Sequence, residues 1–224
     1  MDNLNDYSDS TVIVPIKDEP AVNLVIKDIA KNMPKAKIMV IYKGNNTVWK
    51  RYSKTVKVIE QQSSGKGNAC YEAVKKVNTE IVCFIDGDAT YHAEDLAKLV
   101  SIIRNGADLA IGDRLSNIKN PKVMPRYVLL GNRILTKALN IFYGTKIKDS
   151  QTGLRAIKRN VFNALKLTEP GFGFEEEMLI KAKRLGFSIK EIPIKYSERE
   201  GISKQMKPID GVKLLLILIK HIFD

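Results

Sequence analysis

Ile81-Val82-Cys83-Phe84-Ile85-Asp86-Gly87-Asp88-Ala89-Thr90 is the stretch that decides the fold of this 224-residue chain. Its unbroken apolar run predicts a buried strand of a parallel sheet, and the strand ends in two carboxylates separated by one glycine. The carboxyl ends of such strands form the edge at which open α/β sheets bind ligands. Asp86 and Asp88 are therefore candidate ligands of a divalent cation that also binds phosphate oxygens and water. A second interpretation stays open, because Asp88 could instead cap the helix expected from Ala93.

Similar patterns of strand, polar turn and helix extend along the chain on both sides of this stretch. Strands are expected at 11–16, 37–42, 56–60 and 108–114, and helices at 20–32, from the glycine-flanked Lys66 to about 77, and at 93–105. This alternation predicts a doubly wound α/β fold with a parallel sheet. Further helices are expected over 127–143 and from 171, and a strand over 188–196, in which Pro193 favours a sheet edge. We expect one domain over 11–207, preceded by a flexible start at 1–10 and followed by a separate apolar helix at 208–224.

The tripeptide at 86–88 resembles the D-x-D signature of GT-A glycosyltransferases of family 2. Residues 91–95 extend the likeness to the polyprenyl-phosphate sugar transferases of that family, and the resemblance runs from 12 to about 211. It implies a GT-A (Rossmann-like), mostly parallel sheet flanked by helices, with further helices on the acceptor side. It also implies Mg²⁺ or Mn²⁺ as the cofactor of Asp86 and Asp88, and a nucleoside-diphosphate sugar as the donor.

The resemblance assigns the donor to loops at one edge of the sheet. The residues expected to bind the nucleotide sugar are Pro15, Lys17, Glu19, Lys66, Gly67, Asp86, Gly87, Asp88 and Arg114. Lys66 lies between glycines at a helix start, where backbone N–H groups and a cation suit phosphate. The spacing is not that of a Walker A loop, which argues against an NTPase. Residues 43–46 (Lys-Gly-Asn-Asn) replace an acidic cluster that is common in the family, so the nucleobase stays open.

Basic residues in the second half of the chain are expected to serve the acceptor. The block at 149–159 and the segment at 196–204 both resemble parts of polyprenyl-phosphate transferases. The residues expected to meet the acceptor phosphate are Arg126, Arg133, Asp149, Arg155, Arg199 and Ser203. A buried structural pair of Asp149 with Arg155 is an equally open interpretation. Arg199 and Lys204 lie on a Gly-Ser loop that could close over anionic substrates and exclude water.

The candidate catalytic residues are Asp88, Arg199, Lys204, Glu175 and Glu177. The two glutamates are candidates for a general base, because in the family a carboxylate near this point serves hydroxyl acceptors. Acidic residues in the first turn of a helix also stabilise it without any catalytic duty. An ionised phosphate acceptor needs positioning and charge screening more than a base.

The composition limits the cell compartment and the partners. The formal charge of +12 favours an anionic partner, although a lysine-rich composition by itself explains it equally well. Nucleic acid is not expected, because no basic stripe interleaved with aromatics is present. Cys70 and Cys83 are expected to be buried thiols in a reducing compartment. The start of the chain has no signal-peptide pattern and no apolar run approaches 20 residues, which predicts a cytoplasmic protein.

The segment at 209–223 is rich in aliphatic residues but too short to span a bilayer. It is expected to bind the membrane surface, with Lys213 and Lys220 meeting headgroups, or else to form a homo-oligomer contact. The helix expected at 127–143 has too many apolar positions for one core-facing stripe, so it either contacts lipid or is sandwiched within the protein. The predicted location is peripheral, on the inner face of the cell membrane.

The resulting prediction is an inverting glycosyltransferase that moves a hexose or N-acetylhexosamine to polyprenyl or dolichyl phosphate, for protein N-glycosylation or surface glycan assembly. A UDP-sugar is favoured, because Gly131-Asn132-Arg133 lies on a helix that resembles the archaeal branch acting on dolichyl phosphate. Three alternatives remain. They are a GDP-mannose-dependent dolichyl-phosphate mannose synthase, a family-2 transferase acting on a sugar hydroxyl, and a non-enzymatic basic module that binds polyanions.

Overall fold

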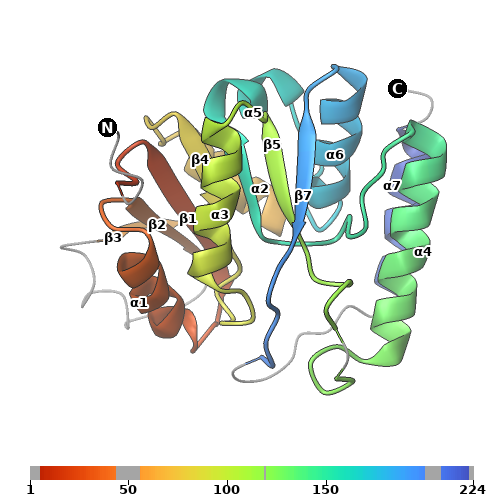
Figure 1. Cartoon of the computed structure of the whole chain (residues 1–224), viewed down its shortest axis with the longest axis horizontal. Helices are drawn as coiled ribbons and strands as arrows, with labels where there is room; N and C mark the ends of the chain where they lie inside the picture. The colour runs from red at the N-terminus through yellow and green to blue at the C-terminus, as the bar shows by residue number, and fades with distance from the viewer. Residues whose placement is uncertain (1–5, 44–55, 119, 200–207, 222–224) are drawn as a thin grey trace.

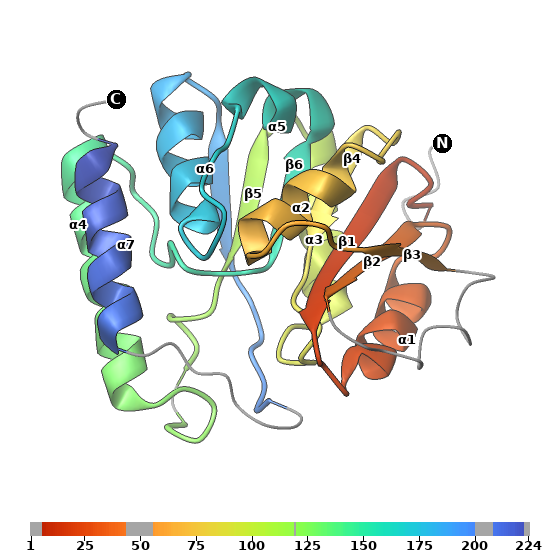
Figure 2. The same cartoon turned by 180° about the vertical axis from the view of Figure 1, so that it is seen from behind.

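The apolar run that opens at Ile81 forms β4 (Ile81–Phe84), an inner strand of the sheet. The computed structural model describes residues 6–43, 56–118, 120–199 and 208–221. Within these residues the sheet has seven strands, in the order β3-β2-β1-β4-β6-β5-β7 (Figures 1 and 2). The other strands are β1 (Ser10–Lys17), β2 (Lys37–Lys43), β3 (Val56–Glu60), β5 (Leu109–Asp113), β6 (Arg155–Lys158) and β7 (Ile189–Pro193). The helices are α1 (Val22–Asn32), α2 (Lys66–Val74), α3 (Ala93–Arg104), α4 (Arg126–Tyr143), α5 (Arg159–Leu165), α6 (Phe174–Arg184) and α7 (Pro208–Lys220).

Side chains of β4 enter two hydrophobic cores, one on each face of the sheet. Cys83 packs with α1 and α3, whereas Val82 and Phe84 pack with α2, α5 and α6. Figures 1 and 2 show these two helical layers from opposite sides. Because successive strand residues point to opposite faces, a strand buried on both faces needs the continuous apolar run that the sequence has.

The sheet is mostly parallel, as expected, but β6 is an exception that the sequence pattern did not predict. β6 runs antiparallel to both of its neighbours, β4 and β5. The remaining pairs, β1 with β2 and β4, β2 with β3, and β5 with β7, are all parallel. β6 has only four residues, and its strand conformation depends on two neighbours that both offer backbone hydrogen bonds. β7 lies at the sheet edge, which confirms the prediction from Pro193.

α4 and α7 lie side by side at the end of the molecule beyond β7, as both views show (Figures 1 and 2). Leu135 and Leu139 of α4 and Leu214 and Leu218 of α7 are buried in the core below them. The Tyr143 hydroxyl of α4 donates to the Leu218 carbonyl of α7 at 2.5 Å. Only the opposite faces of the two helices are therefore available for a partner. Across the described ranges, no helix has both the length and the apolar character needed to cross a bilayer.

Candidate active site

Two adjoining pockets open where β1 and β4 end, at the edge of the sheet that carries the paired carboxylates. The larger pocket has a volume of about 400 Å³ and contains the turn after β1. The smaller pocket has a volume of about 200 Å³ and extends toward α4. Both are lined by Lys66, Asp86, Asp88, Phe172 and Arg199. These shared residues form the boundary between the two pockets, so a group in one pocket lies next to a group in the other.

The backbone around the two aspartates can be built only with glycine. A Cβ at Gly87 would lie 2.4 Å from the Ile16 side chain, and a Cβ at Gly153 would lie 2.4 Å from Oδ2 of Asp86. Asp88 is held from the other side, because its Oδ1 accepts hydrogen bonds from the N–H and the hydroxyl of Thr90 at 3.2 and 2.7 Å. Both carboxylates are thereby fixed at the mouth of the pockets.

Asp88 does not cap the N-terminus of α3. The N–H of Ala93, the first residue of α3, donates to the Asp28 carboxylate at 2.7 Å. The Asp88 carboxylate instead bonds Thr90 and has its other oxygen, Oδ2, 3.4 Å from the Arg199 guanidinium. The carboxylate faces the pocket rather than the helix end.

Lys66 joins the Asp86 carboxylate to a second acid. Its Nζ lies 2.6 Å from Oδ1 of Asp86 and 2.7 Å from Oε1 of Glu175. Burial alone would lower the pKa of Lys66, but the two carboxylates outweigh it and raise the pKa well above its usual value. Lys66 therefore stays charged and lines both pockets. Gly67 lines neither pocket. It packs against the Glu169 carbonyl so closely that a Cβ at this position would lie 2.1 Å from the carbonyl oxygen. The expected donor contact of Gly67 is replaced by close packing.

The donor set of Asp86 and Asp88 fits a hard divalent ion such as Mg²⁺ or Mn²⁺, which prefers oxygen ligands. The Asp86 side chain is 29% exposed and the Asp88 side chain 12%, so both can still reach a ligand in the pocket. Over the part of the chain that the structure describes, no group of three or more His, Cys, Asp and Glu side chains could hold a metal. The protein would therefore supply these two carboxylates, and the remaining ligands would come from substrate and water.

Arg199 connects the C-terminal side of the sheet to the turn after β1. Its guanidinium lies 2.5 Å from the Glu19 carboxylate and 3.4 Å from Asp88. The segment before it is fixed by a β-bridge between Tyr91 and Tyr196 and by a backbone hydrogen bond from Ser197 to Thr90. The larger pocket is also lined by Pro15 and Lys17, so the expected donor residues of β1 gather there with Arg199. Lys204 and Ser203 lie outside the described residues.

Arg114 and Asp149 form a buried ion pair behind the smaller pocket. Nε and Nη2 of Arg114 lie 2.6 and 2.8 Å from the two Asp149 oxygens, and the guanidinium lies over the Tyr196 ring at 5.4 Å. Burial would lower the pKa of Arg114, but Asp149 outweighs it and raises the pKa well above its usual value. Asp149 thus positions Arg114, which lines the smaller pocket, instead of pairing with Arg155 or meeting the substrate itself.

Arg155 does not lie where a residue that binds the acceptor phosphate would lie. Its side chain is fully buried, and its guanidinium donates to the backbone carbonyls of Ser150, Thr152 and Glu175 at 2.7–2.9 Å. A guanidinium needs several acceptors when it leaves water, and three carbonyls supply them here. Arg155 therefore holds the loop before β6 against α6 and is not available to a phosphate.

Arg126 and Arg133 are likewise outside the pockets. Both are exposed on α4 and line neither pocket, because the inner face of the helix start carries other residues. The smaller pocket is lined there by Val123, Met124, Pro125, Val128 and Asn132. One end of this pocket is charged and the wall toward α4 is mainly apolar.

Comparison with known proteins adds the family to this geometry. Residues 11–166 match glycosyl transferase family 2. The chain belongs to this family. One relative is the low-salt glycan biosynthesis hexosyltransferase Agl6 of Haloferax volcanii. It is 38% identical to this chain over 165 residues, which make up 71% of this chain. The family-2 chain spans only 40% of the length of Agl6.

Other relatives match over more of their own length. The dolichyl-phosphate hexose transferase of Haloferax volcanii is 30% identical over 208 residues, which cover 92% of the family-2 chain and 90% of the relative. The UDP-N-acetylglucosamine–dolichyl-phosphate N-acetylglucosaminyltransferase of Methanococcus voltae is 28% identical to this chain over 182 residues. These residues cover 76% of this chain and 72% of the relative. Among solved structures, glucosyl-3-phosphoglycerate synthase from Mycobacterium tuberculosis, in complex with Mn²⁺ and UDP-glucose, has a TM-score of 0.75 at 20% identity. That likeness covers 96% of this chain and 79% of the synthase, and it shows the GT-A fold.

The acids at the start of α6 differ in their surroundings. Glu177 is fully buried and accepts the N–H groups of Thr168 and Glu169 at 2.8 Å. Burial would raise the pKa of Glu177, but the Lys181 ammonium and these N–H groups outweigh it and lower the pKa below its usual value. Glu177 therefore fixes the loop before α6 and is not placed to act as a base. Glu175 does line the smaller pocket, where Lys66 holds one of its oxygens.

Several pocket residues of this family-2 chain were not among the predicted site residues. They are Thr90, Asn132, Gln151, Phe172 and Tyr196. Gln151 and Tyr196 belong to the two segments that resemble polyprenyl-phosphate transferases, and Asn132 belongs to Gly131-Asn132-Arg133. These three side chains are uncharged, whereas the arginines of the same motifs carry the charge that a phosphate site is expected to need.

Proposed function

We propose that the chain transfers a hexose or N-acetylhexosamine from a UDP-sugar to polyprenyl or dolichyl phosphate, with inversion at the anomeric carbon. The observation that carries the proposal is the shared boundary of the two pockets. Lys66, Asp86, Asp88 and Arg199 line both of them, so a diphosphate in the larger pocket would lie next to an acceptor in the smaller one. Such an arrangement allows an acceptor to attack the donor sugar from the side opposite to the leaving diphosphate.

The larger pocket suits the donor. Its charged residues at the shared boundary can meet a diphosphate, and the turn after β1 with Lys17 and Glu19 leaves room for the nucleoside. A divalent ion held by Asp86 and Asp88 would neutralise the charge that develops on the leaving diphosphate. Lys66 keeps Asp86 in place and Arg199 adds a second cation at Asp88. The name of the Methanococcus voltae relative supports UDP as the nucleotide.

The smaller pocket suits an amphipathic phosphate. Arg114, Arg199 and Lys66 provide cations at one end, and Val123, Pro125 and Val128 provide an apolar wall at the other. A polyprenyl phosphate has the same division between a charged head and an apolar chain. Its phosphate is ionised near neutral pH, so it can attack without a general base. This agrees with the absence of a free carboxylate base at Glu177 and with the ion pair of Glu175.

The exposed faces of α4 and α7 support a membrane surface as the further partner. Of the eleven large hydrophobic side chains that are exposed within the described ranges, eight lie on these two helices. They are Tyr127, Leu130, Ile134, Ile141, Phe142, Val212, Leu216 and Ile219. On α4 the exposed Arg126, Arg133 and Lys137 run beside the apolar row. A basic row beside an apolar row is typical of helices that lie on anionic bilayers, and it would hold the protein peripherally on the inner face of the cell membrane.

The test is a screen of radiolabelled UDP- and GDP-sugars with membrane-extracted polyprenyl phosphate, with Mg²⁺, with Mn²⁺ and without metal. We expect a metal-dependent product from a UDP-sugar that is extracted into organic solvent. Transfer from GDP-mannose would replace the donor in the proposal. Transfer to a soluble sugar but not to the lipid phosphate would refute the proposed acceptor, and binding that depends only on salt would favour a non-enzymatic basic module.

A further inference from the structure

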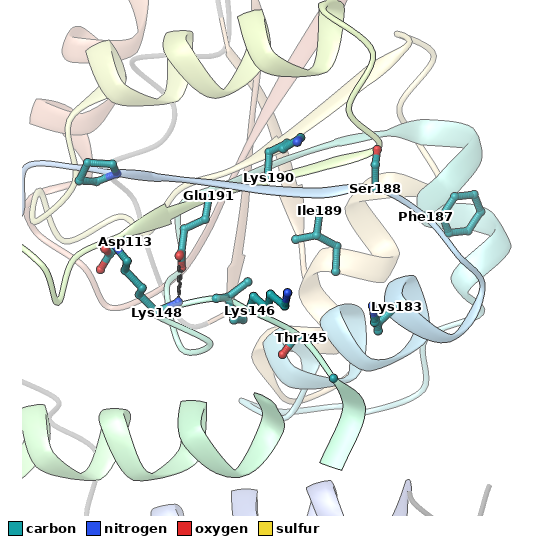
Figure 3. A pocket seen from close by; sticks show the side chains of 13 residues that line it. Asp113, Thr145, Lys146, Lys148, Lys183, Phe187, Ser188, Ile189, Lys190 and Glu191 are labelled. Carbon is teal, nitrogen blue, oxygen red and sulfur yellow. Dashed lines mark hydrogen bonds between the residues drawn. The ribbon is translucent and has the colours of Figure 1, made fainter. Parts of the chain in front are cut away.

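A third pocket opens beside β7 and the C-terminal end of α6 (Figure 3). Its volume is about 560 Å³, and it is lined by the segment at 144–148, by α6 and by β7. No residue that lines it also lines either of the pockets around Asp86 and Asp88. Its inner wall includes Ile147, Phe187 and Ile189, which are partly or fully buried. The pocket is therefore a separate cavity with an apolar wall, the usual character of a small-molecule site.

Cations without counter-ions gather at one end of this pocket. Lys146 extends from its segment toward Lys183 of α6, whereas Lys148 lies nearer Asp113, at the other end of the pocket (Figure 3). None of these three ammonium groups forms an ion pair with another residue that the structure describes. Lys190 points to the opposite side of β7 and does not join them (Figure 3). Like charges that face one space repel each other, and a bound anion would relieve that repulsion.

The other end of the pocket holds a buried acceptor. Asp113 is 1% exposed, its Oδ1 accepts the N–H of Ser116 at 3.0 Å, and its Oδ2 has no hydrogen-bond partner among the described residues. The nearby Glu191 carboxylate already accepts the N–H groups of Lys148 and Asp149 at 2.8–3.0 Å (Figure 3). A buried carboxylate oxygen without a donor costs free energy. A ligand that donates a hydrogen bond to Asp113 would recover that cost.

We infer that this pocket binds a hydroxylated phosphate monoester of the sugar-phosphate class. The phosphate would lie between Lys146 and Lys183, a hydroxyl would donate to Asp113, and the apolar wall would receive the face of the ring. The ligand would not touch Asp86 or Asp88, so the inference goes beyond the proposed transferase activity. Binding at this pocket can be measured whether or not the chain transfers sugar.

The test is isothermal titration of the full chain, in the absence of metal, with glucose 6-phosphate and with inorganic phosphate. The double change Lys146→Ala with Lys183→Ala should weaken the binding of both by about tenfold or more, because it removes two charge-assisted hydrogen bonds. Asp113→Asn should weaken only glucose 6-phosphate, because inorganic phosphate does not reach across to that residue. Thermal unfolding of each variant shows whether the fold is retained, and the exposed lysines should not affect it.

Two matched controls separate the pocket from general charge and from the active site. Lys75→Ala with Lys76→Ala removes the same charge from exposed positions at the end of α2 and should change both dissociation constants by less than about twofold. Arg199→Ala removes a cation from the pockets around Asp88 and should also have little effect. The inference is overturned if the wild-type chain binds neither probe, or if either control weakens binding as much as the Lys146 and Lys183 changes do.

Discussion

The ammonium group of Lys66 lies 2.7 Å from the Glu175 carboxylate, so the start of α2 and the first turn of α6 meet at the active site. The same ammonium lies 2.6 Å from Asp86. The Glu175 side chain is 5% exposed, and its second oxygen has no hydrogen-bond partner among the described residues. The charge of Glu175 is therefore compensated by a cation that also orients the Asp86 carboxylate.

Replacing Lys66 by Met should destabilise the fold by about 3–5 kcal/mol, because it leaves a buried carboxylate without its cation. The double change of Lys66→Met with Glu175→Gln should recover much of that loss. Urea unfolding of the four proteins of this cycle measures the coupling, which we expect to exceed about 1 kcal/mol. Strictly additive effects would mean that the two groups do not interact in solution.

Asp88→Asn should lower sugar transfer by on the order of 100-fold or more while the fold is retained, because it removes ligand charge from the metal site. An asparagine can still accept the two hydrogen bonds from Thr90. The measurements are turnover at saturating Mg²⁺ or Mn²⁺ and the thermal unfolding midpoint. Wild-type turnover with metal present would show that Asp88 is not a metal ligand.

Arg199→Ala should lose most of the activity, whereas Glu175→Gln should retain much of it, because an ionised phosphate needs cations rather than a base. Glu177→Gln should also retain activity but unfold more easily, since Glu177 holds the N–H groups of Thr168 and Glu169. Initial rates and unfolding midpoints for the three variants test this ranking. If Glu175→Gln were the most damaging to turnover and Arg199→Ala the least, the acceptor would be a hydroxyl.

Glu176 should make stability depend on pH between about 4.5 and 8, because burial raises the pKa of its carboxyl to about 8. In that range the folded protein keeps a proton that the unfolded chain releases, so the free energy of unfolding falls as pH rises. Glu176→Gln removes the contribution of Glu176 to this dependence and should become stabilising relative to wild type as pH increases. Urea unfolding from pH 5 to 8 measures the difference. Glu94→Gln is the control, because its exposed carboxyl has a lowered pKa and should affect the slope only below this range.

The apolar surface of α4 and α7 should bind anionic vesicles. Leu130→Gln, Ile134→Gln and Leu216→Gln together should abolish flotation with phosphatidylglycerol–phosphatidylcholine vesicles, since each side chain contributes about 1.5–3 kcal/mol when buried. Changes at exposed apolar positions elsewhere, such as Leu24→Gln with Leu185→Gln, should leave flotation unchanged.

Removing residues 214–224 would test this surface less clearly, because the deletion also removes Leu214 and Leu218, which belong to the core.

Nucleotide binding should survive the three glutamine substitutions on α4 and α7, whereas turnover should fall more on a long-chain acceptor than on a short soluble analogue. Unchanged flotation together with a smaller hydrodynamic radius would instead assign the surface to a homo-oligomer.

The central strand and its two carboxylates could be predicted from the sequence, because burial on both faces demands a continuous apolar run and the polar residues after that run are left at the sheet edge. The same local rules identified α3, α4 and the edge position of β7. They also located the turn with Glu19 and the glycine-flanked Lys66 at one edge of the sheet, since the carboxyl ends of parallel strands meet there.

Only the tertiary structure decided which charged groups face a ligand and which serve the interior. Arg114, Arg155 and Arg199 stand in similar motifs, yet Arg114 is held by Asp149, Arg155 by three carbonyls, and Arg199 lies at the pocket boundary. β6 was equally hidden, because its strand conformation depends on β4 and β5. A cation or a short strand takes its role from partners that are distant in the chain, and local pattern carries no information about which partners the fold will bring to it.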